Sequence, residues 1–244
     1  MLPGWTVSTI AGKPVDILAP KSASRFALLF LHPVGLESPA VNSAYTTALQ
    51  NAGLFCVAPH GSQSWWSDRI CPDFDPALTA EKFLLDSVVP WMMREWSLDD
   101  RSIAVAGISM GGQGAIRLGF KYPDRFPVVA GVASAFDYHE WHGRGTPIDA
   151  MYRSKEACRQ DTAILQVHPS KFPPHIWFCC DPLDHEWYRG NDRLHEKLNA
   201  VGIPHTVDFT TSHGGHNWAY FNAMAEPMAQ FCRTSLEREA RRLL

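Results

Sequence analysis

The sequence predicts an α/β protein in which a mostly parallel central sheet is covered by helices on both faces. Two observations lead to this fold class. The chain has 244 residues and is 45% hydrophobic, which is enough to bury one large core. Apolar runs of strand length alternate with longer segments of helical periodicity. Such alternation is typical of parallel sheets with helices on both sides.

The first predicted element is a hairpin over residues 5–18, so the sheet is expected to begin with an antiparallel strand. Buried strands are predicted at 26–32, 54–60, 102–109, 126–134, 175–180 and 205–211. Helices are predicted between and after them at 39–53, 79–96, 110–121, 191–202 and 218–236. Pro90 is expected to kink or interrupt the second helix.

Charge and hydropathy argue against several classes of partner. The formal net charge is −3, so no basic field predicts binding to nucleic acid or to an anionic membrane. No apolar run approaches the ~18 residues that a membrane-spanning helix needs. Residues 1–20 also lack the basic and apolar regions of a signal peptide. We therefore expect a soluble, cytoplasmic protein.

The six cysteines do not show the spacing of a zinc site. In a chain of this length they are expected to be reduced and mostly buried thiols. Cys71 lies in a loop rich in Pro and Asp and is expected to be the most exposed of them. Neither a metal nor an organic cofactor is expected.

Ser109 stands in the sequence Gly-Ile-Ser-Met-Gly, residues 107–111, between a predicted strand and a predicted helix. The pattern G-x-S-x-G in this setting predicts a nucleophilic serine on a sharp turn. Glycines are needed there because the two backbones pass close together. The helix N-terminus that follows presents N–H groups to developing negative charge. The backbone N–H of Met110 is therefore a predicted oxyanion donor.

A serine is a weak nucleophile unless a general base activates it. In this kind of fold the base is a histidine near the end of the chain. His216 is the predicted base, because Gly214 and Gly215 form a tight loop that can direct it toward Ser109. His213 is the weaker alternative.

The acid that orients this histidine is expected in the loop after the strand at 175–180. Asp181 and Asp184 both lie there, and the sequence leaves the choice open. Asp184 is favoured, because Asp181 stands beside Pro182 and could instead stabilise the turn.

A second oxyanion donor is expected in the loop after the strand at 26–32. Pro33 has no N–H, so Val34 is the first available donor, with Gly35 and Leu36 as alternatives.

Three tryptophans are candidates for the substrate pocket. Trp65 and Trp66 either form a pocket wall or cover the core beneath a long loop. Trp218 is expected to pack beside the His216 ring. The polar and aromatic segment 136–170 is predicted to be an insertion over the active site, within a single domain of residues 1–244.

These residues resemble the putative-esterase branch of the α/β-hydrolases, which includes esterase D, S-formylglutathione hydrolases, tributyrin esterases and feruloyl or acetylxylan esterases. The resemblance spans residues 26–231. It rests on AGISMGGQGAIRLGFKYPDRF with Ser109, on DPLD with Asp184, and on GGHNW with His216. Gln113 stands where S-formylglutathione hydrolases typically have a histidine. The resemblance therefore does not predict hydrolysis of S-formylglutathione in particular.

The resemblance implies the α/β-hydrolase fold and a serine carboxylesterase. The predicted activity is hydrolysis of small or short-chain acyl esters through a Ser-His-Asp triad and an acyl-enzyme, without a cofactor; the resemblance itself does not select the acyl or alcohol group. A thioesterase or acyltransferase with the same triad is the alternative. A non-catalytic binding module of this fold is a more distant one.

Overall fold

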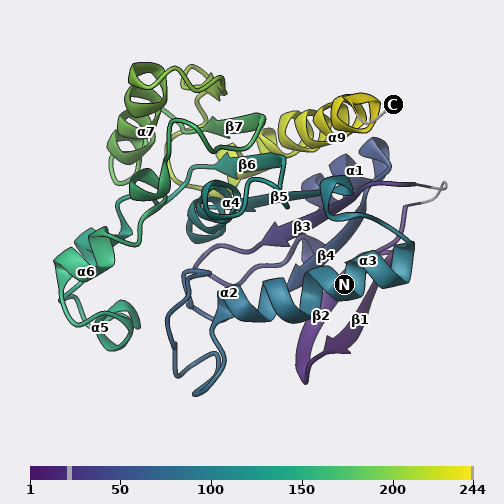
Figure 1. Ribbon diagram of the computed structural model, residues 1–244, viewed down its shortest axis with the longest axis horizontal. Coiled ribbons are helices and arrows are strands. Elements are labelled where there is room, and N and C mark those ends of the chain that lie inside the picture. Colours follow the sequence, from purple (N-terminus) through teal and green to yellow (C-terminus); the bar gives the residue numbers. More distant parts are fainter. Residues whose placement is uncertain (21–23, 243–244) are drawn as a thin grey trace.

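The computed structural model describes residues 1–20 and 24–242 of the chain, and its centre is one eight-stranded sheet (Figure 1). The strand order is β1-β2-β4-β3-β5-β6-β7-β8. β1 (Trp5–Ile10) and β2 (Lys13–Leu18) form an antiparallel hairpin, and β2 also pairs antiparallel with β4 (Phe55–Pro59). The remaining strand pairings are parallel. They run in sequence from β4 to β3 (Ala27–Leu31), from β3 to β5 (Ile103–Ile108), from β5 to β6 (Val128–Val132), from β6 to β7 (His175–Cys179) and from β7 to β8 (Thr206–Asp208). The predicted mostly parallel sheet with an antiparallel start is confirmed.

Helices cover both faces of this sheet (Figure 1). Successive side chains of a strand point to opposite faces, so Leu28 and Phe30 join one core cluster while Leu29 and Leu31 join the other. The face of Leu29 packs against α2 (Ala80–Phe83), α3 (Val89–Trp96), α4 (Met110–Lys121) and α7 (Tyr188–Ala200). The face of Leu28 packs against α1 (Ser43–Ala52), α8 (Trp218–Ala223) and α9 (Ala225–Arg242).

The helix predicted at 79–96 contains one widened turn. A π-helical turn, Leu84–Val88, lies between α2 and α3, and the Val89 N–H reaches back to the Leu84 carbonyl. A proline ring presses on the carbonyl four residues before it. The wide turn ends at Val88, and Pro90 lies in the first turn of α3, so an internal boundary stands where the sequence predicts a kink or interruption.

Segment 136–170 consists of short helices joined by loops, and Figure 1 shows two of them, α5 (Ile148–Met151) and α6 (Lys155–Arg159), extending from the body of the molecule. Two 3₁₀ turns, η4 (Tyr138–Trp141) and η5 (Ala163–Gln166), flank them. Arg117 of α4 anchors the segment: its buried guanidinium pairs with the Glu81 and Asp161 carboxylates. Because α4 begins directly after Ser109, the anchor joins the segment to the helix that follows the candidate nucleophile.

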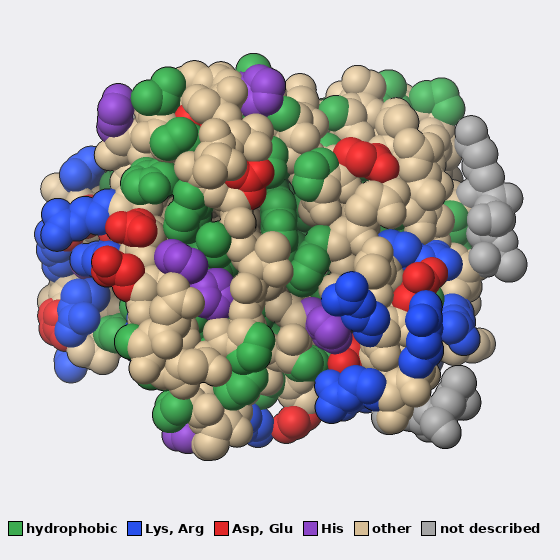
Figure 2. Space-filling view, turned by 90° about the horizontal axis from the view of Figure 1, so that it is seen from above, with side chains coloured by type: hydrophobic (Ala, Val, Ile, Leu, Met, Phe, Trp, Pro, Cys, Tyr) green, Lys and Arg blue, Asp and Glu red, His purple; other side chains and the backbone are tan. Residues whose placement is uncertain are grey.

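Charged side chains are mixed on the molecular surface. On the face drawn in Figure 2, Lys and Arg lie beside Asp and Glu in groups at its left and lower right. Within residues 1–20 and 24–242, the helices are too short or too polar to cross a membrane. All six cysteines are free and buried, as predicted, but the expectation that Cys71 is exposed was wrong. Its loop folds back on itself, and the side chain joins the core.

Candidate active site

The turn that presents Ser109 lies between β5 and α4 and has a strained backbone. Ser109 has φ 54° and ψ −114°, a region that few non-glycine residues occupy. A Cβ atom on Gly107 would lie 2.6 Å from the Leu31 carbonyl oxygen, and one on Gly111 would lie 2.8 Å from that of His32. Both positions therefore require glycine, because β3 passes directly beside the turn.

Three side chains from distant parts of the sequence form a hydrogen-bonded row. The Ser109 Oγ lies 3.1 Å from His216 Nε2, and His216 Nδ1 lies 2.7 Å from Asp184 Oδ2. With its Nδ1–H donated to the carboxylate, the imidazole presents a bare Nε2 to the serine hydroxyl. The row joins the ends of β5, β7 and β8. The His213 side chain is exposed and is not part of it.

The two aspartates of the β7 loop have different partners. The Asp181 carboxylate accepts hydrogen bonds from the backbone N–H groups of Leu183 and His213, at 2.8 and 2.6 Å, and from the Ser212 hydroxyl at 2.8 Å. Burial opposes its ionisation, but these bonds outweigh burial and lower the pKa of Asp181 to about 2. Asp181 thus fastens the β7 and β8 loops to each other, and Asp184 contacts the imidazole.

The Asp184 carboxylate is itself held in place. Its Oδ1 accepts the backbone N–H groups of Glu186 and Trp187, at 3.2 and 3.0 Å. The Cys180 thiol lies 3.6 Å from Oδ2, the oxygen that faces His216. The side chain is buried, so these contacts replace water around its charge.

The predicted oxyanion donors lie at two turns, one directly after Ser109 and one directly after β3. Met110 is the first residue of α4, and Val34 lies in a turn closed by the Leu36 N–H and the Pro33 carbonyl at 3.0 Å. That bond occupies Leu36 and removes it as a donor. The N–H groups of Met110 and Val34 have no backbone acceptor among residues 1–20 and 24–242. Both remain predicted donors, with Gly35 as the alternative to Val34.

His32 supports the turn that contains Val34. Its Nδ1–H donates to the Pro33 carbonyl at 2.8 Å, and its Nε2 accepts the Gly61 N–H at 2.9 Å. Burial lowers the pKa of His32 to about 4, so the folded protein holds this imidazole neutral. The neutral ring is required, because a protonated Nε2 could not accept from Gly61.

This burial predicts a loss of stability in mild acid. The unfolded chain protonates His32 near its ordinary pKa of 6.5, and the folded protein does so only at about 4. The stability that the neutral His32 contributes is therefore fully present above pH 6.5, falls as the pH drops, and is lost by about pH 4. The free energy of unfolding decreases by about 3 kcal/mol over this range. Urea unfolding at several pH values gives the free energy of unfolding as a function of pH. This free energy should fall less steeply with decreasing pH for His32→Gln than for the wild type. Equal pH dependence in the two proteins would contradict the expectation. Because both proteins contain the other histidines, the contribution of those histidines cancels in the difference.

Trp65 and Trp66 are fully buried, which favours the second of their two predicted roles, packing beneath the loop. The Trp65 ring stacks on Tyr138, with centroids 4.6 Å apart, and the Trp66 indole N–H donates to the His32 carbonyl at 3.2 Å. Both tryptophans, like Ser62, have positive φ, which costs about 1–3 kcal/mol each. The strain indicates that the path of residues 61–66 is imposed by the tertiary structure.

The expectation that Trp218 packs beside the His216 ring was wrong. The Trp218 ring packs on Phe221, and Phe221 meets the His216 ring edge-on with centroids 4.9 Å apart. The Trp187 ring, three residues after Asp184, also lies near the imidazole, with its centroid 6.4 Å from that of His216. Sequence reasoning missed Phe221 and Trp187, although Phe221 lies one helical turn after Trp218. Spacing alone does not show which aromatic residue of a turn faces inward.

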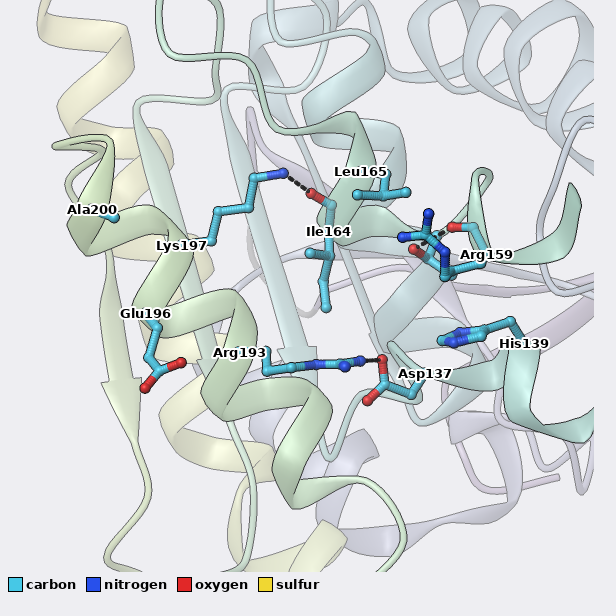
Figure 3. A pocket seen from close by; sticks show the side chains of 10 residues that line it. Asp137, His139, Arg159, Ile164, Leu165, Arg193, Glu196, Lys197 and Ala200 are labelled. Carbon is cyan, nitrogen blue, oxygen red and sulfur yellow. Dashed lines mark hydrogen bonds and ion pairs between the residues drawn. The ribbon is translucent and has the colours of Figure 1, made fainter. Parts of the chain in front are cut away.

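A cavity of about 480 Å³ lies apart from this row, between α7, η4 and η5 (Figure 3). Each of its cationic side chains already has a partner in the protein. Arg193 pairs with Asp137, Arg159 pairs with Glu156, and Lys197 donates to the Ile164 carbonyl at 2.6 Å. Ser109, Asp184 and His216 are not part of its lining.

Comparison with known sequences places this site in a family. The model of the family described as "Putative esterase" matches residues 54–229, which include all three residues of the row. The diacylglycerol acyltransferase/mycolyltransferase Ag85B of Mycobacterium leprae is 22% identical over 77% of this chain and 68% of that protein.

Solved structures of similar fold cover nearly the whole chain. An S-formylglutathione hydrolase from Agrobacterium tumefaciens superposes with a TM-score of 0.75, at 15% identity, over 92% of this chain and 90% of its own. The fluorophosphonate-binding serine hydrolase FphF of Staphylococcus aureus gives 0.73, at 15% identity, over 91% and 92%. The predicted α/β-hydrolase fold is thereby confirmed. The chain belongs to the Putative esterase family, and it is an enzyme of the carboxylic ester hydrolase class.

Proposed function

We propose that the protein is a serine carboxylesterase that acts on small or short-chain acyl esters, with Ser109 as nucleophile, His216 as general base and Asp184 as the acid that orients it. The observation that carries this proposal is the row Ser109–His216–Asp184, with contacts of 3.1 and 2.7 Å. These are hydrogen-bond distances, as a proton relay between nucleophile and base requires.

In the first half of the reaction, His216 Nε2 takes the Ser109 proton while Oγ attacks the ester carbonyl carbon. The carbonyl oxygen becomes an oxyanion, which the N–H groups of Met110 and Val34 stabilise; one such donor typically contributes about 3 kcal/mol. The Asp184 carboxylate stabilises the imidazolium through Nδ1. His216 then returns its proton to the leaving alkoxide, and the alcohol departs from an acyl-enzyme.

In the second half, His216 takes a proton from water, and the resulting hydroxide attacks the acyl carbon. A second oxyanion forms at the same donors. As it collapses, the bond to Ser109 Oγ breaks, His216 returns its proton to that oxygen, and the carboxylic acid departs. Because the His216 side chain is 26% exposed, water can reach it without movement of the fold.

The direct test combines turnover with covalent labelling. We expect hydrolysis of p-nitrophenyl acetate, and we expect a fluorophosphonate probe to attach once per chain, at Ser109, as located by peptide mass spectrometry. Loss of turnover should follow the fraction labelled. Attachment at another residue, or full labelling with unchanged turnover, would contradict the proposal.

An acyltransferase is the second candidate, favoured by the similarity to the mycobacterial acyltransferase Ag85B. The same acyl-enzyme would then pass its acyl group to an alcohol or thiol, and a thioesterase would start from a thioester. Product analysis with water, glycerol and a small thiol as competing acceptors separates these activities.

A further inference from the structure

The oxyanion loop, Pro33–Leu36, contains a peptide bond with two available orientations. In a four-residue turn closed between its first and last residues, rotation of the central peptide interconverts type I and type II. Here the closing bond is Leu36 N–H to the Pro33 carbonyl, and the central peptide joins Val34 to Gly35. Type II needs a positive φ at the third position, which glycine accepts without steric cost. Gly35 does not have a positive φ in this structure, as in type I.

Only one side-chain hydrogen bond to this central peptide is seen among the described residues, and it comes from Gln63. The Gln63 Nε2–H donates to the Val34 carbonyl at 3.2 Å. In a planar trans peptide the carbonyl and the N–H point in opposite directions. A Val34 carbonyl held toward Gln63 therefore turns the Gly35 N–H to the other side. The proposed function requires the oxyanion to form on that side, and in the rotated form a carbonyl oxygen would occupy it and repel the negative charge.

The neighbouring peptide is fixed independently of Gln63. The Pro33 carbonyl accepts both the Leu36 N–H and the His32 Nδ1–H, so the Val34 N–H cannot easily turn. Of the two peptides that offer donors in this loop, the Val34–Gly35 peptide is thus the one whose orientation depends on a single side chain.

The segment that presents Gln63 is strained and firmly anchored. Ser62, Trp65 and Trp66 all have positive φ on either side of it. Its ends are tied to β3 by the Gly61 N–H on His32 Nε2 and the Trp66 indole on the His32 carbonyl. Backbone strain of this kind is retained where the surrounding structure imposes it, and it clusters at functional sites.

We propose that Gln63 is a positioning residue for the esterase reaction: it selects the turn form of Pro33–Leu36 in which N–H groups, and not the Val34 carbonyl, face the oxyanion. This inference rests on the proposed function, because it assumes that the oxyanion forms at this loop. Gln63 acts through the Val34 carbonyl and does not touch the substrate.

The test uses two substitutions with opposite effects on the turn. Gln63→Leu keeps the size of the side chain and removes the donor; we expect kcat to fall about tenfold with KM within about twofold, because the oxyanion exists only after attack. Binding of a boronic acid that forms a tetrahedral adduct should weaken by a similar factor. Gln230→Leu, on the exposed part of α9, is the matched control and should change neither value.

Rescue distinguishes positioning from a general structural role. Alanine at position 35 disfavours the positive φ of type II about tenfold in population. Its Cβ would meet only the flexible end of Glu37, which can move aside. The double variant Gln63→Leu/Gly35→Ala should therefore recover most of the lost kcat.

Two results would overturn the inference: wild-type kcat and boronic acid affinity in Gln63→Leu, or a double variant no better than Gln63→Leu. Failure of the proposed function would look different, since the wild-type protein itself would then hydrolyse no ester and would not react with a fluorophosphonate at Ser109.

Discussion

Replacing Ser109 with alanine is expected to lower kcat/KM for ester hydrolysis by about 10⁴- to 10⁶-fold, the largest functional effect of any single substitution in this chain. The variant removes the only atom that can form the acyl-enzyme and leaves His216 and Asp184 in place. Activity should be measured with p-nitrophenyl acetate, under conditions in which a contaminating esterase at one part in 10⁵ would be detected.

The fold should survive this change. The hydroxyl contributes one hydrogen bond, to His216 Nε2, and alanine accepts the positive φ of the turn no worse than serine does. Urea midpoints of variant and wild type should therefore agree closely. Turnover that persists in a folded Ser109→Ala protein, and that is not removed by further purification, would refute the proposed mechanism.

Much of the fold follows from local pattern. Strands buried on both faces are short continuous apolar runs, and the predicted runs at 26–32 and 102–109 contain β3 and β5 with an error of one residue at either end. Helix details depend on tertiary contacts. The predicted helix at 218–236 is interrupted at Met224, and the one at 191–202 begins three residues earlier, at Tyr188. Pro227, in the first turn of α9, is a local sign of the interruption at Met224, whereas Gly190 lies inside α7 and does not mark its start.

The site residues show the same difference between local pattern and tertiary contact. Ser109 and His216 lie in motifs whose glycines are a local geometric requirement, so the sequence points to them directly. The choice between Asp181 and Asp184 depends on which of the two side chains faces His216. Both lie within four residues of the same loop, so the sequence does not decide between them. Gln63 has no motif at all. Its hydrogen bond to Val34 joins residues 29 positions apart, and pairing of that kind is visible only once the chain is folded.

The two aspartates provide the second large effect. Asp184→Asn should lower kcat about 10⁴-fold, because an amide cannot stabilise the imidazolium and can favour the wrong tautomer of His216. Asp181→Asn should lose stability instead, by about 1–3 kcal/mol, because its carboxylate accepts bonds from Leu183, His213 and Ser212 that an amide only partly replaces.

These variants form a matched pair, since each replaces one oxygen of a buried carboxylate by an NH₂ group in the same loop. Activity per folded molecule, with the folded fraction taken from urea unfolding, is the quantity to compare. The contacts predict a crossed result: Asp184→Asn folds and barely turns over, while Asp181→Asn unfolds more easily and keeps kcat within about tenfold. A folded Asp181→Asn protein as inactive as Asp184→Asn would transfer the acid's role, because the 2.7 Å contact to His216 would then be insufficient to assign it.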